Sequence, residues 1–420
     1  MTTFIEVHAL RSFPPSNLNR DDLGTPKTAV FGGSRRLRIS SQCLKRTWRM
    51  SEHFRGAFAE TQLGIRTDRL PEQVLTAVGT ALDEEGRAGL VALLASIGKK
   101  GGKAKAGEGD EPDAADDEGE DDDAEAGDKP RTAHLLFLSR QEIDAVTAFA
   151  LEKKDALKKV LKKKKVDTEV VKKLREELKK YLQTHTSKNA VDVGLFGRFV
   201  TSTEIDTIEG ALQVAHALGT QKVEVEYDYF TAVDDLGEEP GAGHLGESEF
   251  ASSVLYLYAC CDLEQLERNL GARTDEGRVT DAEAKQLARK SLPALVRALA
   301  EATPKGKKTG TAPHTPAEYV EVVVRRGAPL SYANAFVKPV GEREERGDVM
   351  AASITRLVKH RDRIEAAYGR DSDAIGRFIL CLRDVDGEGG AAKKSEVKTL
   401  AEVCAGLAAV LDSKPPKPAR

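Results

Sequence analysis

A low-complexity stretch at residues 99–131 limits how this chain of 420 residues can fold. It consists largely of Gly, Ala and Lys followed by acids, and residues 108–128 alone hold 13 acidic side chains and no basic one. Such a segment cannot bury enough apolar surface to offset the entropy lost on ordering it, so we expect it to be disordered. The chain must therefore build its core from the sequence before and after this stretch.

The rest of the chain is basic. Without the 13 acids of residues 108–128, the formal net charge of −4 becomes +9. A basic body suits a polyanionic partner and makes a small neutral substrate less expected. The acidic run itself has three readings that the sequence leaves open: a mimic of nucleic acid, a block to self-association, or a solubilising insertion.

The sequence predicts a cytoplasmic protein without a membrane partner. It contains no run of about 18 apolar residues, and its first residues lack a basic region followed by an apolar signal core. The cysteines are scattered and form no C-x-x-C pair, which is typical of reduced thiols. They are Cys43, Cys260, Cys261, Cys381 and Cys404.

Hydrophobic periodicity predicts a few strands separated by long helical stretches. Strand patterns occur at 4–10, 36–40, 191–202, 222–230, 251–263 and 318–326, and helical patterns at 41–58, 59–98, 134–184, 209–218 and 280–303. Residues 222–230 alternate strictly, which predicts one solvated face. Ser40 or Ser41 is the expected N-cap of the helix at 41–58. This pattern favours a small α+β core carrying a helical insertion.

Motifs for catalysis are absent from the sequence. There is no phosphate loop, no G-x-S-x-G nucleophile elbow and no H-E-x-x-H, and no histidine falls at metal-ligand spacing. His216 lies in the amphipathic pattern at 209–218, so we expect it to be packed or capped. Asp234 and Asp235 could bind Mg²⁺ or could simply support a turn. We therefore predict a protein that is not an enzyme and has no metal and no cofactor.

The most informative segment is the basic stretch at 32–54. Arg35, Arg36 and Arg38 precede the helix, Lys45, Arg46 and Arg49 lie within it, and no acid occurs from Gly24 to Met50. The free amides and the positive dipole end of the helix add to these charges. Such a concentration of cations predicts polyanion binding, since arginines and amides suit phosphate oxygens.

Two further basic segments are weaker candidates. The loop PKGKKTG at 304–310 offers Lys305, Lys307 and Lys308 to a phosphate backbone, but an ordinary surface loop fits equally well. The lysines within 152–183 alternate with a helical apolar stripe. That face is either solvated or turned toward nucleic acid.

Four blocks of the sequence, in the same order, resemble the backbone subunit of the type I-E CRISPR Cascade complex, the CasC family. They cover most of the chain outside roughly 59–185. The blocks are SNLNRDDLGTPKTAVFGGSRRLRISSQCLKR (16–46), VDVGLFGRFVTS with GALQVAHAL (191–202 and 210–218), YFTAVDDLGEEPGAGHLGESEFASSVLYLYA (229–259) and GAPLSYANAFVKPV (327–340).

The resemblance implies an α+β, hand-like fold. A palm similar to an RNA-recognition motif (ferredoxin-like) carries a helical fingers insertion and a β-hairpin thumb. The palm would comprise residues 1–58, 191–219 and 251–420, the fingers 59–190 and the thumb 220–250.

The resemblance also implies a role. About six copies would lie side by side along the spacer of a CRISPR RNA as a helical filament. Each copy would grip the RNA backbone and leave bases free to pair with target DNA in antiviral defence. Further partners would be the large, small, cap and crRNA-processing subunits. By matching position, the RNA contacts would be Arg20, Lys27, Ser40, Gln42, Lys45, Arg46, Arg49, Tyr229, Phe230, Thr231 and Val233.

The chain also departs from that family. Tyr229 stands where a Trp is expected, although both side chains can stack on a base. The sequence after GRFVTS looks short, so no base-wedging residue is assigned there, and Arg35, Arg36 and Arg38 have no assigned partner. Aromatic residues make up only 5% of the chain and form no base-stacking string. One alternative is an RNA-cleaving relative of the type III backbone subunits, using Asp21, Asp22, Asp234 or Asp235. Another is a generic RNA-binding or ribosome-associated protein that binds as a monomer.

Overall fold

The computed structural model describes nine stretches of the chain. They are residues 2–97, 130–162, 165–186, 188–200, 202–233, 242–274, 277–341, 343–383 and 396–413. Almost all of the segment expected to be disordered, and the Asp234–Asp235 pair, lie outside the described residues.

A large, mostly antiparallel sheet forms the body. Its order is β16-β15-β14-β1-β11-β9-β3-β2, with β8 and β10 also paired to β11. At its centre, β1 (Thr3–Ser16) pairs with β11 (Ala242–Asp262) on one side and with β14 (Tyr319–Arg326) on the other. The remaining strands are β2 (Thr28–Phe31), β3 (Ser34–Ile39), β8 (Leu212–Val214), β9 (Ala217–Gly219), β10 (Glu226–Val233), β15 (Ala374–Cys381) and β16 (Glu396–Val397). The strand expected at 4–10 is confirmed as part of β1, and the sheet has more strands than the sequence predicted.

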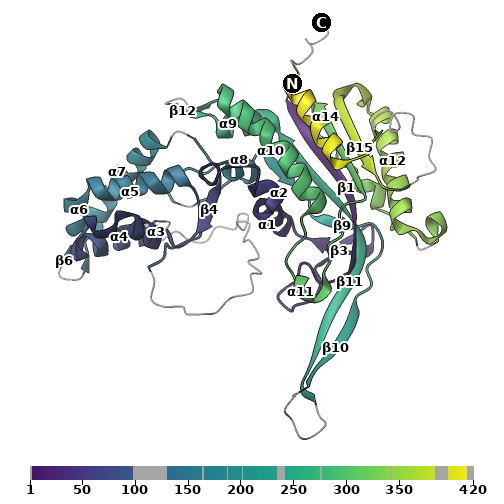
Figure 1. The fold of residues 1–420 in the computed structure, drawn as a ribbon, viewed down its shortest axis with the longest axis horizontal. Coiled ribbons are helices and arrows are strands. Elements are labelled where there is room, and N and C mark those ends of the chain that lie inside the picture. The colour runs from purple at the N-terminus through teal and green to yellow at the C-terminus, as the bar shows by residue number, and fades with distance from the viewer. Residues whose placement is uncertain are drawn as a thin grey trace.

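Helices cover both faces of this sheet (Figure 1). Alternate residues of β1 point to opposite sides, because side chains in a strand have a period of two. Ile5, Val7 and Ala9 pack against one helical layer, and Leu10 packs beneath the other. The first layer holds α1 (Ser41–Met50), α2 (Glu52–Arg55), α8 (Val191–Phe196), α9 (Leu263–Leu270), α10 (Ala282–Glu301) and α14 (Leu400–Asp412), and the second is α12 (Val349–Ala367).

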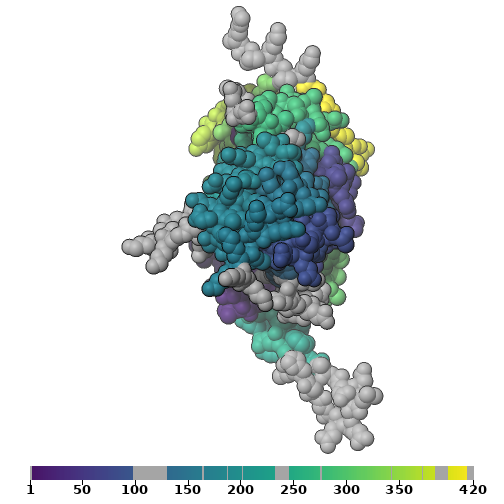
Figure 2. Space-filling model, turned by 90° about the vertical axis from the view of Figure 1, so that its left-hand side faces the viewer, coloured from purple at the N-terminus to yellow at the C-terminus, as the bar shows by residue number. Residues whose placement is uncertain are grey.

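A helical lobe with its own core projects from one end of the sheet. Its buried residues all come from 70–205. In α4, Gly89 approaches the helix α6 so closely that a Cβ at Gly89 would lie 2.0 Å from the Leu157 carbonyl oxygen. Figure 2, in which the lobe faces the viewer, shows it in blue and teal above the projecting hairpin. Its elements are β4 (Gly64–Thr67), α3 (Leu70–Val78), α4 (Glu84–Ala95), β5 (Leu136–Ser139), α5 (Arg140–Glu152), α6 (Lys154–Lys158), β6 (Leu161–Lys162), β7 (Lys165–Val166) and α7 (Thr168–His185).

Deleting residues 108–128 is expected to leave the melting temperature unchanged. Every buried core residue of the described lobe lies at 97 or below or at 136 or above. The acidic run has no apolar side chains beyond alanine with which to join a core. Thermal unfolding of the deletion variant beside the full chain tests this expectation, and a fall of several degrees would show that the run is structural.

Strands β10 and β11 form a hairpin that extends well beyond the body (Figure 1). Only its root is buried, at Val223, while Tyr227 and Tyr229 are exposed. The strict alternation at 222–230 predicted a strand with one solvated face. The strand is present as β10, and its acidic side is exposed as expected. Tyr227 and Tyr229 on the other side are exposed as well, so this part of the hairpin is solvated on both faces.

Two local predictions are wrong. Residues 191–196 form the helix α8 rather than a strand, and β8 and β9 replace the helix expected at 209–218. Both segments are short and apolar, so their periodicity cannot separate helix from strand. Pairing of β8 with Ala259–Cys261 of β11 decides the second case. The helix expected at 41–58 is also interrupted, since Ser51 ends α1 and caps α2.

The other short elements are β12 (Ala272–Thr274), β13 (Gly277–Val279), α11 (Lys308–Thr311) and several single turns of 3₁₀ helix. No helix among the described residues is long and apolar enough to cross a membrane. The same residues contain no group of three or more His, Cys, Asp or Glu side chains that could hold a metal ion.

Candidate nucleic-acid interface

The start of α1 is fixed by two buried polar contacts. The Ser40 hydroxyl accepts a hydrogen bond from the Cys43 amide at 3.2 Å, which confirms Ser40 as the N-cap. The Ser40 amide donates to Asn19 Oδ1 at 2.8 Å. Ser40 is only 2% exposed, so its side chain serves the helix rather than the surface. These contacts tie the loop after β1 to the first turn of α1.

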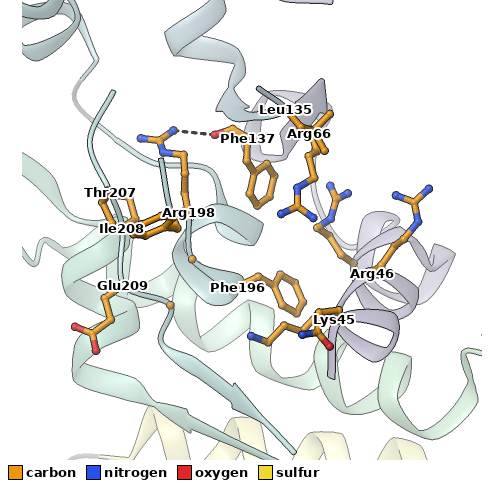
Figure 3. A pocket seen from close by; sticks show the side chains of 15 residues that line it. Lys45, Arg46, Arg66, Leu135, Phe137, Phe196, Arg198, Thr207, Ile208 and Glu209 are labelled. Atoms are coloured by element: carbon orange, nitrogen blue, oxygen red, sulfur yellow. Dashed lines mark hydrogen bonds between the residues drawn. The ribbon is translucent and has the colours of Figure 1, made fainter. Parts of the chain in front are cut away.

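A hollow of about 430 Å³ opens between α1 and the root of the helical lobe. Five cations line it, together with three phenylalanines and Glu209. In Figure 3 Arg46 and Arg66 flank one side, Arg198 lies across from them, and the rings of Phe137 and Phe196 project between. The full lining is Gln42, Lys45, Arg46, Arg49, Arg66, Leu135, Phe137, Phe196, Gly197, Arg198, Phe199, Thr207, Ile208, Glu209 and Gly210.

Arg49 and Arg198 make buried contacts within the protein. Arg49 is 8% exposed, and its Nη1 lies 3.5 Å from Asp192 Oδ2. Burial lowers the pKa of Arg49 and raises that of Asp192. Arg198 donates to the Glu142 carboxylate at 2.8 Å and to the Phe137 carbonyl at 2.9 Å. Arg198 therefore holds the segment after α8 to the lobe. Arg49 joins α1 to α8 and lies 5.0 Å from the centre of the Phe137 ring of the lobe, so it is not the exposed RNA contact that the sequence suggested.

The other three cations form the rim of the hollow. Arg46 and Arg66 are exposed and Lys45 is half-buried. Lys45 and Arg46 come from the helix that the sequence singled out, whereas Arg66 lies on β4, on the lobe side. Gln42 joins them from the first turn of α1. This arrangement can meet successive phosphates of a single strand with cations from two sides.

The arginines of β3 have different environments. Arg36 is fully buried and donates to the carbonyl oxygens of Gly219, Thr220 and Phe336 at 2.9–3.0 Å. It therefore stabilises the fold and does not belong to the expected polyanion grip. Arg35 is exposed, and Arg38 lies 3.1 Å from His216 Nδ1.

His216 is exposed between β8 and β9, so its expected packing in a helix is wrong. Its Nδ1 lies 3.3 Å from the Ser41 amide nitrogen at the first turn of α1. This position places an imidazole beside the helix N-terminus, next to Arg38. Sequence periodicity could not show this, because β8 and β9 reach α1 only through the sheet.

The loop after β1 carries Arg20 and Lys27 to the base of the hairpin. The Asn17 amide donates to the Gly24 carbonyl at 2.9 Å and to the Glu249 carbonyl at 3.0 Å. Asp21 accepts from the Leu23 amide and from the amide and hydroxyl of Thr25, and these hydrogen bonds lower its pKa. The loop is thus locked internally and joined to β11, and Arg20 and Lys27 are half-buried on it.

The basic loop of Lys305, Lys307 and Lys308 packs beside this segment. A Cβ at Gly306 would lie 2.4 Å from the Leu18 carbonyl oxygen, which places the two backbones in contact. Lys307 has a left-handed φ of 43° and is the N-cap residue of the short α11. The structure therefore brings these weaker candidates next to Arg20 and Lys27, at the foot of the hairpin.

The hairpin residues form a separate surface. Tyr229 is 68% exposed and Phe230 is 48% exposed. Thr231 is exposed as well, and Val233 is described only by its backbone at the end of β10. No hairpin residue lines the hollow. The sequence-predicted residues thus fall into three groups: the hollow, the foot of the hairpin and the hairpin itself.

Several residues at the hollow had no role assigned from the sequence. Arg66 and Phe137 come from the lobe, Phe196 ends α8, and Phe199 is 70% exposed there. The sequence signal for a site on this side of the hollow was GRF at 197–199, in which an aromatic residue follows a glycine and an arginine. The structure gives the glycine, Gly197, a φ of 80°. Without the fold, nothing placed that segment opposite α1.

Comparisons with known proteins agree with this architecture. The sequence matches the CT1975-like protein family over residues 5–405, and the chain belongs to that family. It resembles a solved chain titled "CRISPR RNA-guided surveillance complex, pre-nicking", with a TM-score of 0.72 and 28% identity, covering 97% of this chain and 100% of that one. A second, titled "CRISPR RNA-guided surveillance complex", has a TM-score of 0.63 and 24% identity over 97% and 99%, which shows the fold alone. No curated protein matches.

Proposed function

We propose that this protein is the CRISPR RNA-binding backbone subunit of a type I-E Cascade surveillance complex. The observation that carries the proposal is the full-length likeness to a chain of a CRISPR RNA-guided surveillance complex, at 28% identity and a TM-score of 0.72. Copies bind side by side along the spacer of the RNA, together with the other subunits of the complex. The bases remain available to pair with target DNA.

The charges of the hollow support a grip on phosphates. Lys45, Arg46 and Arg66 offer cations that suit phosphate oxygens. In RNA-guided effectors sequence recognition is delegated to base pairing, so the protein needs to hold only the backbone. Contacts of this kind fix the position of a strand and carry no sequence information.

The proposed palm, fingers and thumb correspond to the sheet with its helices, the helical lobe and the hairpin. In this proposal the sheet and its covering helices are the RNA-recognition-motif-like palm (1–58, 191–219 and 251–420). The helical lobe is the fingers (59–190), and its separate core supports that assignment. The hairpin is the thumb (220–250). The foot of the hairpin, with Arg20, Lys27 and the lysine loop, lies where palm and thumb meet.

We further propose that the protein is not a nuclease. The alternative, cleavage of bound RNA as in type III relatives, needs a carboxylate available to metal or water. Asp21 is occupied by three hydrogen bonds within its own loop, which is a turn-forming role. Asp22 is exposed, and Asp234 and Asp235 lie outside the described residues.

Co-expression with a CRISPR RNA tests the proposed function. The full chain is expected to purify with that RNA in a particle several times the mass of one copy, and ribonuclease treatment should reduce the particle to smaller species. A monomer free of RNA would contradict the proposal. Incubating the assembled particle with complementary RNA and Mg²⁺ addresses the alternative, since regularly spaced cuts in that RNA would establish a nuclease.

A further inference from the structure

Three arginines that line the hollow lie close enough to affect one another. Arg46 and Arg49 are three residues apart on α1 and therefore share a face of that helix. Arg66 comes from β4, and Figure 3 shows it on the same side of the hollow as Arg46. Guanidinium groups stay charged at neutral pH, so three of them gathered together repel one another unless an anion lies among them. A buried carboxylate, that of Asp192, lies against this group.

Arg49 is the innermost of the three arginines. It is 8% exposed, whereas Arg46 and Arg66 are exposed. Its Nη1 lies 3.5 Å from Asp192 Oδ2. Burial lowers the pKa of Arg49, Asp192 opposes that change, and the positive charges of Arg66 and Arg46 add to it. Asp192 is therefore the counter-charge of Arg49, and the two other arginines act on Arg49 as like charges.

Asp192 is fixed in place by the backbone around it. Its Oδ1 accepts hydrogen bonds from the Gly64 amide at 2.7 Å and from the Val193 amide at 3.1 Å. Its Oδ2 accepts no hydrogen bond within the described chain, so the ion pair with Arg49 is what compensates that oxygen there. Asp192 is 0% exposed and cannot touch a nucleic acid. Any effect of Asp192 on RNA binding must therefore pass through Arg49.

A phosphate in the hollow and Asp192 compete for the charge of Arg49. Moving the guanidinium to a phosphate would leave the buried carboxylate without its partner, which is strongly unfavourable. The phosphates are therefore met by the rim cations Lys45, Arg46 and Arg66, and Arg49 with its partner adds no net charge. In the free protein the same carboxylate offsets part of the repulsion among the arginines, which helps to keep α1 and β4 together.

From this geometry we propose that Asp192 is a positioning residue that limits how tightly the hollow binds RNA. It holds Arg49 back from the phosphates and keeps the arginines gathered before RNA arrives. Removing its charge should therefore have two opposite effects: the free protein becomes less stable, and RNA binding becomes tighter. The inference rests on the proposed function, because it requires an RNA backbone in the hollow. It involves no base, so the effect should be the same for every RNA sequence.

The Asp192→Asn variant of the full chain tests the inference. An asparagine keeps the size of the side chain and an oxygen that can accept from the Gly64 amide, but it frees the charge of Arg49. Binding of labelled single-stranded RNA should become about tenfold tighter, because one further cation meets a phosphate. The dependence of log K on log salt should steepen by about 0.7. The melting temperature without RNA should fall, whereas a residue with a merely structural role would lower stability and affinity together.

The matched control is Glu204→Gln. Glu204 is also buried and pairs with an arginine, Arg175 of α7, but neither residue lines the hollow. The control removes the same charge from another buried ion pair at the helical lobe. It should lower the melting temperature and leave the affinity for RNA and its salt dependence at wild-type values.

A double variant, Asp192→Asn with Arg49→Met, isolates the role of Arg49. It removes both charges of the pair, so no buried charge is left uncompensated and the protein should fold even where the single variant does not. The methionine keeps an unbranched side chain beside the Phe137 ring, which lies 5.0 Å from the Arg49 guanidinium. Its affinity and salt slope should equal those of the wild type, because Arg49 contributes no free charge there.

Each other result overturns the inference. Unchanged or weaker binding by a folded Asp192→Asn variant would show that the carboxylate is merely structural. An equal gain in Glu204→Gln, or a gain that persists in the double variant, would show a general effect of charge. A tenfold loss of affinity in the double variant would show that Arg49 already holds a phosphate in the wild type. Failure of the wild type to bind RNA would refute the proposed function itself, whereas the other results leave that function standing.

Discussion

Replacing both Lys45 and Arg46 with alanine is expected to weaken binding of single-stranded RNA roughly a hundredfold, since each lost contact between a cation and a phosphate costs about 1.5 kcal/mol. Both residues line the rim of the hollow, on the helix whose N-terminus points at the same region. The loss should be the same for every RNA sequence. The dependence of log K on log salt should flatten by about 0.7 per lost contact. Fluorescence anisotropy with labelled RNA across a salt series measures both quantities.

The matched control is Lys359→Ala with Arg363→Ala. These exposed residues lie on α12, which covers the opposite face of the sheet from α1. The control removes the same charge, so it separates loss of a specific contact from loss of net charge. Arg49 is a poor choice for this experiment, because truncating it would also break its buried pair with Asp192. Equal affinities and slopes for the two double variants would show that α1 does not hold the RNA.

The second large effect concerns stability. Replacing Arg325 with alanine is expected to lower the free energy of unfolding by about 3–5 kcal/mol, because it leaves the buried Glu6 carboxylate without its counter-charge. Arg325 lies within the sheet, 2.8 Å from Glu6 and 2.7 Å from Glu365, and its side chain is 0% exposed. Tyr332 donates to the same Glu365 carboxylate at 2.7 Å. The loss of one guanidinium therefore disturbs a connected network.

The comparison for that variant is Arg383→Ala. Arg383 also pairs with a carboxylate, Glu318 at 2.6 Å, but its side chain is 40% exposed. Exposed pairs contribute at most about 1 kcal/mol. Denaturant unfolding of both variants measures the difference. If the two variants were equally stable, the buried network under α12 would not be a major contributor to the fold.

Much of the framework could be predicted from local pattern. The strand pattern at 4–10 is confirmed as part of β1, and the segments at 251–263, 280–303 and 318–326 were assigned correctly to β11, α10 and β14. In each case the element is long and its period is clear. The segments at 191–196 and 209–218 were wrong, because they are short and apolar and because pairing with β11 settles their structure.

The residues of the candidate site could likewise be predicted only in part from the sequence. The absence of acids around α1 drew attention to Lys45 and Arg46, and the structure places both at the hollow. The sequence could not separate them from Arg36 and Arg49, because burial of an arginine depends on partners far along the chain. For Arg36 those partners are carbonyls from residues 219–220 and 336–337, and for Arg49 the partner is Asp192. Arg66 was missed because only the fold brings β4 opposite α1.

The central claim is that copies of this protein follow one another along an RNA and hold its backbone. Nuclease footprinting of the particle assembled on a CRISPR RNA tests it most directly. The account predicts protection that repeats at a constant nucleotide interval along the spacer and is unchanged when the spacer sequence is replaced. A single protected segment that moves with the sequence, or an unprotected spacer, would contradict it.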